Sequence, residues 1–349
     1  MRLLIEPLSL RLRQPFVIAH GASTTRENVL VRLIGEGDVG ASRGRGGALE
    51  GLGEAAAVPY LGESRAGIVA YLEGLERALP ELDPLTFAHV IDALPPGSAA
   101  ARAAVDMALH DAFGKVLGAP LYRLFGLAAG RVPPSSFTIA IGAPEEMARA
   151  ARTAPLPVLK LKLGADGEAV DLARVDAVRA ASALPIRVDA NAGWSRESAE
   201  RLLPRLAERG VELCEQPLPA GDLEGLRALS RLPKRPALFA DEGIRTSADI
   251  VAHAGLVEGV VIKLAKSGGL RGALRDITLA RALGLDVLLS CMIESSVAVT
   301  AAAHLAPLCQ HVDLDGPLLI DNDPFEGVLH REGRLILPDR PGLGLVARP

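Results

Sequence analysis

Five polar residues recur at an almost constant interval through the middle of the chain, each at the end of a short apolar run. Lys162, Asp189, Glu215, Asp241 and Lys266 follow one another after 27, 26, 26 and 25 residues. An interval of this length holds one strand, one helix and the turns that join them. The interval therefore predicts a series of βα units whose strand ends carry polar groups.

Between residues 132 and 320, eight apolar runs alternate with seven amphipathic helical segments. The runs are SFTIAIG, PVLKLKLG, PIRVDA, VELCEQP, ALFADEG, GVVIKLAKSGG, LDVLLSCMIES and HVDLDGP. This pattern predicts an α/β fold with a parallel barrel closed on itself, in which all strand ends face one mouth. A doubly wound open sheet is disfavoured, because no GxGxxG motif follows the first strand and the polar feature repeats at every strand end. The five polar residues are therefore expected to converge.

Residues 1–125 follow a different pattern and predict a small α+β domain. The runs at 2–12 and 28–37 favour an antiparallel meander, and the glycine-rich segment 40–64 is typical of a long loop. A helix is predicted after Ser98, a residue type preferred at the N-cap, with a stop at residues 118–120. The tail, 325–349, contains a hairpin pattern at 333–346 and is expected to return to this domain.

Charge and composition exclude several classes of partner. The 349 residues carry a formal net charge of −4, with no basic stripe for nucleic acid, so a small molecule is the expected partner. The longest apolar stretches are too short to span a bilayer and the N-terminus lacks a signal peptide's apolar block, which predicts a cytoplasmic protein with no membrane partner. The odd number of cysteines, Cys214, Cys291 and Cys309, without CxxC spacing, favours reduced thiols over disulfides or a zinc site.

Three of the recurring residues are carboxylates that would lie side by side on consecutive strands. Asp189, Glu215 and Asp241 would repel one another strongly unless they were protonated or bridged by a cation. Oxygen ligands without histidine or cysteine favour Mg²⁺, or Mn²⁺, over Zn²⁺. The alternative is that each acid caps a strand or pairs with a lysine. Because three acids recur at the same spacing, a metal site is favoured over this alternative.

Lysines are expected on both sides of these carboxylates. Lys160 and Lys162 lie two apart on one strand, and Lys263 and Lys266 lie across the mouth. Burial and a nearby cation both disfavour the charged form of a lysine, which makes it a usable base. The alternatives are a salt bridge for Lys160 and a structural role for Lys263. Two bases and a metal suit removal of a proton α to a carboxylate, where the metal neutralises the enediolate and the second lysine returns the proton on the opposite face. The outcome would be racemisation or epimerisation.

The motifs LKLKLG, RVDANAGW, CEQPL, ADEG, IKLAKSGG and CMIESS together resemble the enolase superfamily, in its muconate lactonizing enzyme-like subgroup. The resemblance covers the whole chain and implies an α+β capping domain over a (β/α)7β TIM-like barrel. By the resemblance, Asp189, Glu215 and Asp241 would bind one Mg²⁺, Lys162 and Lys266 would be the acid/base pair, and Lys160 would face the substrate carboxylate. Supporting positions behind these groups are implied for Asn191, Glu242, Lys263 and Glu294.

The segment HVDLDGP is similar to the motif with which dipeptide epimerases hold the α-ammonium group of their substrate. Asp313 and Asp315 would bind that cation. The alternative is that the pair caps a turn, and the rival DND at 321–323 is expected to form a loop. The resemblance also implies substrate contacts for Thr138 and Cys291, with core packing as the alternative for each; Cys291 has no histidine placed to make it a nucleophile. An acid role for Glu294, as in cycloisomerases, is the alternative to a supporting one.

Some positions depart from the pattern. The usual DES is here DEG, with Gly243, and Val261 replaces an asparagine, which puts the surroundings of the ligands in question. Relatives that act on Ala-Glu carry an early arginine where this chain has His20 or Gly21, with Arg26 later, so an acidic substrate side chain is not supported.

The sequence therefore predicts an isomerase, a Mg²⁺-dependent dipeptide epimerase that moves the α-proton of the C-terminal residue between Lys162 and Lys266. An N-acylamino acid racemase or o-succinylbenzoate synthase is the first alternative, and would not need Asp313 and Asp315. A cycloisomerase would need one lysine only, and a non-catalytic barrel scaffold would show no Mg²⁺ dependence. The choice of dipeptide is expected to depend on 16–28 and 51–63. A homo-oligomer is expected because such barrels often associate.

Overall fold

The computed structural model describes residues 2–35, 49–76 and 85–349. Its N-terminal part begins with an antiparallel meander of β1 (Arg2–Ile18), β2 (Gly21–Gly35) and β3 (Leu49–Ala55). The meander expected from the first two apolar runs is therefore confirmed. β1 and β2 form a long hairpin whose end reaches the barrel, where Ile141 N donates to Val17 O at 3.0 Å.

The third strand of the meander corrects the sequence interpretation, because Leu49–Ala55 lies inside the segment predicted as a long loop. Its glycines allow a close approach to a helix. A Cβ at Gly51 would lie 2.0 Å from Ala108 O, and one at Gly53 would lie 1.9 Å from Ala104 O. The glycines therefore reflect helix packing on the strand, which a local sequence pattern cannot distinguish from a loop. The rest of the predicted loop up to residue 48 lies outside the described residues.

Helices complete the capping domain: α1 (Arg65–Glu76), α2 (Ala88–Ala93), α3 (Ala99–Leu117) and α4 (Leu121–Leu124). The helix predicted after Ser98 is present, and Ser98 caps it by accepting a hydrogen bond from Ala101 N at 3.0 Å. It ends at Gly118, whose φ of 68° suits glycine. α3 is buried along most of its length because it packs between the meander and the barrel.

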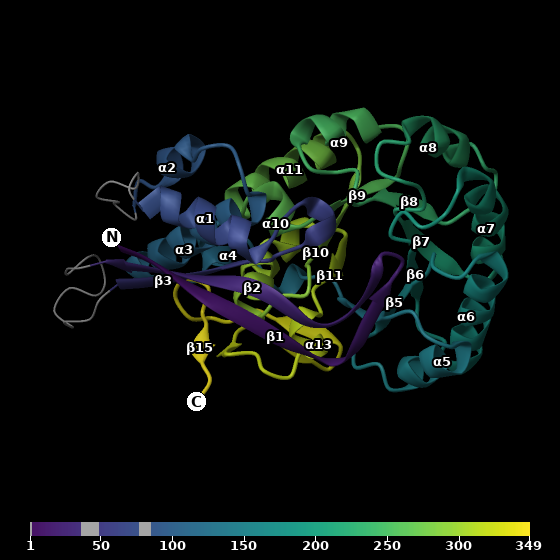
Figure 1. Cartoon of the computed structure of the whole chain (residues 1–349), viewed down its shortest axis with the longest axis horizontal. Coiled ribbons are helices and arrows are strands. Elements are labelled where there is room, and N and C mark those ends of the chain that lie inside the picture. Colours follow the sequence, from purple (N-terminus) through teal and green to yellow (C-terminus); the bar gives the residue numbers. More distant parts are fainter. Residues whose placement is uncertain (1, 36–48, 77–84) are drawn as a thin grey trace.

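The second part of the chain is the predicted barrel, with parallel strands in sequence order from β4 to β11 (Figure 1). The strands are β4 (Ser136–Ile139), β5 (Val158–Lys162), β6 (Ile186–Asp189), β7 (Val211–Glu215), β8 (Ala237–Ala240), β9 (Gly259–Ile262), β10 (Asp286–Ser290) and β11 (His311–Asp313). A parallel bridge between Ser135 and Val312 joins the two edges. The fold class predicted from the sequence is confirmed.

Helices follow the strands and surround them. They are α5 (Pro144–Arg152), α6 (Glu168–Ala181), α7 (Arg196–Glu208), α8 (Leu223–Ser230), α9 (Ser247–His253), α10 (Leu264–Ser267), α11 (Leu270–Ala282), α12 (Ser296–Ala303) and α13 (Gly316–Leu319). Short 3₁₀ turns occur at η2 (Pro59–Leu61), η3 (Ala129–Arg131) and η4 (Ala306–Leu308). No helix in the described ranges has the length and apolarity needed to cross a membrane.

The C-terminal tail packs against the capping domain. It contains β12 (Phe325–Glu326), β13 (Leu329–Arg331), β14 (Arg334–Ile336) and β15 (Val346–Ala347). The hairpin pairs β13 with β14, so it begins before the predicted segment 333–346. Leu343 N donates to Asp111 Oδ1 at 2.8 Å. The domain limits inferred from the sequence stay a prediction.

A buried histidine lies where the tail, α4 and the barrel meet. His304 Nδ1 accepts a hydrogen bond from Tyr122 N at 3.3 Å, and its Nε2 lies 3.2 Å from Leu343 O. This pairing requires the neutral imidazole with its proton on Nε2, and burial lowers the pKa of His304 to about 4. The packing of the tail therefore depends on an uncharged histidine.

Candidate active site

The five recurring residues converge at the C-terminal ends of the barrel strands. Lys162, Asp189 and Glu215 are register partners at the ends of β5, β6 and β7. Asp241 follows β8 directly, and Lys266 lies on α10 just after β9. All five are buried. The strand-end position alone brings them together, because parallel strands of a barrel end on one face.

Lysine ammonium groups lie between the carboxylates. Lys160 Nζ is 3.2 Å from Asp189 Oδ2 and 2.8 Å from Glu215 Oε2, and Lys162 Nζ donates to Asp189 Oδ2 at 2.6 Å. On the other side, Lys263 Nζ donates to Asp241 Oδ2 at 2.6 Å. The charges of the site therefore alternate, which offsets the repulsion among three buried acids.

Lys266 is held by several acceptors. Its Nζ donates to a carboxylate oxygen of Asp241, to Asp241 O at 2.6 Å and to Val261 O at 3.1 Å. Burial lowers the pKa of Lys266, although Asp241 opposes the shift. Burial acts in the same direction on Lys160, but Asp313, Glu215 and Asp189 outweigh it and raise the pKa of Lys160 well above the ordinary lysine value. The two lysines are therefore suited to different tasks.

Glu215 differs from the two neighbouring acids. Among the described residues, neither of its buried oxygens accepts a hydrogen bond, although Oε2 forms the ion pair with Lys160 Nζ at 2.8 Å. Burial together with the charge of Asp189 raises the pKa of Glu215 well above the usual range. Burial acts on Asp189 and Asp241 too, but neighbouring lysines outweigh it and hold the pKa of each below its usual range. Glu215 therefore has one lysine contact and lies between two ionised acids, and a further cation would stabilise the charged form of such a buried carboxyl group.

The donor set fits a hard divalent cation, since Asp189, Glu215 and Asp241 all offer carboxylate oxygens. Among the residues that the structure describes, no group of three Asp, Glu, His or Cys side chains is arranged to hold a metal ion as it stands. The reason is that lysine ammonium groups occupy the spaces between the carboxylates. These ammonium groups balance the same negative charge that a divalent cation would balance.

Asp313 and Asp315 reach this site from the last strand. Asp313 Oδ2 accepts a hydrogen bond from Lys160 Nζ at 2.8 Å, and its Oδ1 accepts one from Ser136 Oγ at 2.7 Å. Asp315 Oδ2 accepts one from Thr138 N at 2.6 Å, and burial raises the pKa of Asp315 to about 7. The rival DND lies elsewhere: Asp323 accepts from Ser296 N at 2.9 Å at the start of α12. The sequence interpretation of DND as a loop agrees with this placement.

The supporting residues lie beside the acids. Asn191 N donates to Asp189 Oδ1 at 2.9 Å, and its Nδ2 donates to Glu242 Oε1 at 3.1 Å. Burial raises the pKa of Glu242 to about 7, with the charge of Asp241 acting in the same direction. Asn191 has a φ of 43°, a conformation that asparagine tolerates better than most residues. The strand RVDA therefore ends in a turn that orients both Asp189 and Glu242.

Glu294 lies beneath the mouth and not on its surface. Its Oε2 accepts a hydrogen bond from Met292 N at 3.0 Å, while its buried Oε1 has no partner in the described residues. Burial and the charge of Glu54 raise the pKa of Glu294 to about 8. No pattern in the sequence indicated a role for Glu54, which accepts hydrogen bonds from Asn28 and Ser295 and so links the cap to the barrel.

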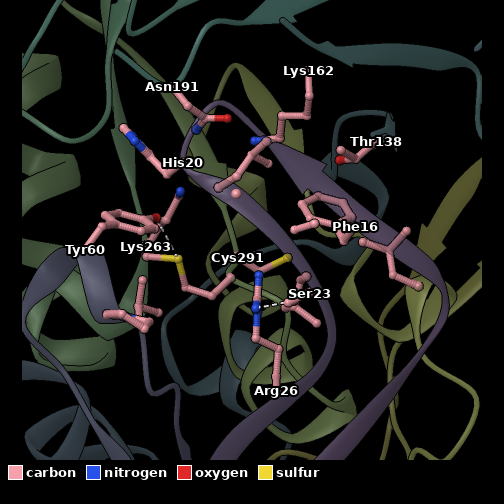
Figure 2. Close-up of a pocket in the computed structure, with 18 of the residues that line it drawn as sticks. Phe16, His20, Ser23, Arg26, Tyr60, Thr138, Lys162, Asn191, Lys263 and Cys291 are labelled. Carbon is pink, nitrogen blue, oxygen red and sulfur yellow. Dashed lines mark hydrogen bonds between the residues drawn. The ribbon is translucent and has the colours of Figure 1, made fainter. Parts of the chain in front are cut away.

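A cavity of about 380 Å³ opens above these groups. Thr138, Lys160, Lys162, Asn191, Lys263, Cys291, Asp313 and Asp315 line its barrel side. Its other wall comes from the cap, through residues between 16 and 26 and between 57 and 60, within the two segments expected to govern substrate choice. Figure 2 shows His20 and Tyr60 on one side of the cavity and Arg26 reaching toward Cys291. No pattern in the sequence singled out Tyr60, which lines the cavity and whose hydroxyl lies 3.5 Å from Met292 Sδ.

The two departures from the family pattern have local explanations. A Cβ at Gly243 would lie 2.9 Å from His253 Nε2, so the histidine ring occupies the space of a side chain there. Val261 packs in the barrel with Leu213, Phe239 and Leu288, and its carbonyl accepts a hydrogen bond from Lys266 Nζ. Neither departure removes a carboxylate or a lysine from the mouth.

The structure has the architecture that the sequence resemblance implied, a capping domain over a barrel with acids and lysines at its mouth. Family models match both parts of the chain. The model for the N-terminal domain of mandelate racemase / muconate lactonizing enzyme matches residues 3–126, and the model described as enolase C-terminal domain-like matches residues 143–349. The chain therefore belongs to the mandelate racemase / muconate lactonizing enzyme family of the enolase superfamily.

Individual relatives match nearly the whole chain. An L-Ala-D/L-Glu epimerase of Bacteroides thetaiotaomicron is 38% identical over 99% of this chain and 88% of its own length. A dipeptide epimerase of Methylococcus capsulatus, solved with Mg and the dipeptide L-Arg-D-Lys, is 33% identical with a TM-score of 0.87, covering 99% of this chain and 98% of that one. An N-succinyl Arg/Lys racemase of Bacillus cereus is 30% identical with a TM-score of 0.89, covering 100% and 96%. The resemblance and the isomerase class expected from the sequence are confirmed.

Proposed function

We propose that this enzyme is a Mg²⁺-dependent dipeptide epimerase that inverts the α-carbon of the C-terminal residue by a 1,1-proton transfer. The observation that carries the proposal is the placement of Asp313 and Asp315 in the same cavity as Lys160 and Lys162. A carboxylate pair in the same cavity as the proposed base Lys162 suits a substrate that carries a free ammonium group. The relatives named above as dipeptide epimerases support the same choice.

The two proposed bases approach from opposite sides of the mouth. Lys162 ends β5 and Lys266 follows β9, which lies four strands further around an eight-stranded barrel. An α-carbon bound between them presents one face to each lysine, so one removes the proton and the other returns a proton on the opposite face. Lys266 has to leave its contacts with Asp241 before its amine can reach the substrate.

Asp189, Glu215 and Asp241 are proposed to hold one Mg²⁺, for which Mn²⁺ is a possible substitute. When bound there, the ion would supply positive charge next to the substrate carboxylate, where negative charge develops as the α-proton leaves. Lys160 keeps its positive charge in this surrounding and is proposed to face the same carboxylate. Asn191, Glu242 and Lys263 are proposed to orient the acids through the hydrogen bonds described above.

Asp313 and Asp315 are proposed to bind the α-ammonium group of the N-terminal residue. Thr138 holds Asp315 through its backbone N–H, and Ser136 holds Asp313, so both carboxylates are oriented before substrate arrives. Cys291 lines the same side of the cavity and is proposed to contact the substrate without a chemical role. Burial raises the pKa of its thiol well above the usual range, which leaves it protonated and unreactive.

An N-acylamino acid racemase remains the second candidate, because one observation favours it. Lys160 already pairs with Asp313 at 2.8 Å, so part of the negative charge proposed for an ammonium group is balanced within the protein. The Bacillus cereus relative named as an N-succinyl Arg/Lys racemase has a similar fold. The oligomeric state and the cytoplasmic location expected from the sequence stay predictions.

Proton exchange at the α-carbon separates the two candidates. L,L-dipeptides and N-succinylamino acids are incubated with the enzyme and Mg²⁺ in D₂O, and ¹H NMR follows the loss of each α-proton signal. We expect deuterium to enter the C-terminal residue of dipeptides, with exchange abolished by a chelator and restored by Mg²⁺. Asp313→Asn should lower dipeptide exchange strongly. Exchange confined to the N-succinyl compounds would assign the racemase instead.

A further inference from the structure

Two walls of the cavity come from distant parts of the chain and are joined behind the lining by one buried amide. The cap wall includes Ala57, and the barrel wall includes Ile293, which follows β10. Asn28, buried on β2, contacts both walls: its Oδ1 accepts a hydrogen bond from Ala57 N at 3.3 Å, and its Nδ2 donates to Ile293 O at 3.1 Å. The relative position of the two walls therefore depends on one side chain.

The orientation of the Asn28 amide is set by Glu54, a buried acid near the end of β3. Glu54 Oε1 accepts a hydrogen bond from Asn28 Nδ2 at 2.8 Å, so the amide donates to two acceptors and accepts from one donor. In the opposite orientation, its oxygen would face Glu54 and Ile293 O, and its N–H groups would face Ala57 N. Only one orientation satisfies all three neighbours.

The carboxyl group of Glu54 also holds the start of α12, which follows the barrel wall in the chain. Glu54 Oε2 accepts hydrogen bonds from Ser295 Oγ at 2.6 Å and from Ser295 N at 3.1 Å, and a longer one from Ala298 N at 3.4 Å. Backbone N–H groups of a first helical turn lack partners within the helix, so an acid from another segment can bind them. Glu54 therefore fixes Ser295 directly and Ile293 through Asn28.

Packing between the same two walls adds to this connection. Ala56 and Val58 of the cap belong to a small apolar cluster that includes Met292 of the barrel wall. Val58 and Met292 both line the cavity. Because these contacts cross from the cap to the barrel, a shift of either wall would change the shape of the space offered to a substrate.

A second acid, Asp323 of the tail, binds the same helix start. It accepts hydrogen bonds from Ser296 N at 2.9 Å and from Ser296 Oγ at 2.7 Å, and one from Phe325 N at 3.1 Å. These bonds connect α12 with the tail, whereas those of Glu54 connect α12 with the cap. The two acids therefore differ in whether they reach the walls of the cavity.

We propose that Glu54 is a positioning residue for substrate binding, which keeps the cap wall and the barrel wall of the cavity together. The two walls are residues 57–60 and 291–293. Glu54 lies behind the described lining, so it acts through Asn28 and Ser295 and not by contact with the substrate. The proposal rests on the function proposed above for the identity of the substrate.

The proposed bases are held by other acids. Lys162 contacts Asp189, and Lys266 contacts Asp241. Loss of Glu54 should therefore weaken substrate binding more than it slows the proton transfer.

The test compares the wild-type enzyme with Glu54→Gln in the α-proton exchange assay with Mg²⁺, over a range of concentrations of one active dipeptide. Glutamine keeps the shape of the side chain but replaces one acceptor with a donor, so either Asn28 or Ser295 loses its partner. We expect KM to rise about 5- to 30-fold, the usual effect of one buried hydrogen bond, while kcat changes less than about 2-fold. Asn28→Ser should also raise KM. The double variant should show less than the product of the two effects, since both residues act through the same contact.

Asp323→Asn is the matched control, because it removes an acid from the same helix start. It should lower the free energy of unfolding in urea and leave KM within about 2-fold of the wild-type value. A wild-type KM in Glu54→Gln, an equal rise of KM in Asp323→Asn, or fully multiplicative effects in the double variant would overturn the proposal. If Glu54→Gln does not fold, KM of Asn28→Ser decides alone, since Glu54 still holds α12 in that variant.

Failure of the epimerase function would give a different result. Wild-type exchange confined to N-succinyl compounds would overturn that function, while the same comparison of KM on those compounds would still test Glu54.

Discussion

The arrangement of lysines at the barrel mouth makes a sharp prediction for two single variants, Lys162→Met and Lys266→Met. If each lysine serves one face of the α-carbon, each variant should lose proton abstraction from one epimer of the substrate and keep it from the other. A general base contributes roughly 100- to 10,000-fold to the rate, so exchange should fall by about that factor for the affected epimer only.

The structure also sets the expected cost in stability. Without Lys162, Asp189 still has Lys160 at 3.2 Å, and without Lys266, Asp241 still has Lys263 at 2.6 Å. Removing the single partner of a buried charge costs about 3–5 kcal/mol. A remaining ammonium group should limit the loss to about 1–2 kcal/mol, so both variants should fold.

The assay follows α-proton exchange by NMR, starting separately from the L,L and L,D epimers of one active dipeptide. Urea unfolding of each variant checks the stability estimate. Lys234→Met is the matched control, because Lys234 pairs with Glu208 on the surface at 3.4 Å, far from the mouth in the fold. Equal losses for both epimers in each variant would refute the assignment of one lysine to each face.

Three further predictions concern the metal, the cap and pH. Glu215→Gln should weaken Mg²⁺ binding at least about 10-fold in calorimetric titrations, and unchanged affinity would exclude Glu215 as a ligand. Gly53→Ala should destabilise the protein by about 3 kcal/mol or more in urea unfolding, because the added Cβ would lie 1.9 Å from Ala104 O. Gly74→Ala is the control: its added Cβ would have no atom within 4 Å, so it should stabilise α1 by about 0.5–1 kcal/mol. His304 is neutral when folded, so the unfolded chain binds more protons and stability should fall by about 2 kcal/mol between pH 7 and pH 5, given a folded pKa of about 4. Replacing His304 with Asn should remove that part of the pH dependence; a variant with the wild-type slope would contradict it.

Several structural features were predictable because they depend on local patterns. Alternating strand and helix periods identified the barrel, and the Ser98 cap with Gly118 marked the ends of α3. The meander's third strand was not predictable, because Gly51 and Gly53 owe their presence to the backbone of α3, about fifty residues away. A glycine needed for close packing and a glycine in a loop look the same in one sequence.

The sequence by itself determined which charged groups meet at the barrel mouth. Lys162, Asp189, Glu215 and Asp241 end consecutive strands, and parallel strands in a barrel must end on one face, so their convergence follows from their spacing. Only the tertiary structure decided how the cap completes the site. Arg26 enters the cavity because the β1–β2 hairpin docks on strands more than a hundred residues later in the chain. That docking depends on contacts between surfaces that form only once both parts have folded. A periodic pattern along the chain therefore cannot predict the position of Arg26 in the cavity.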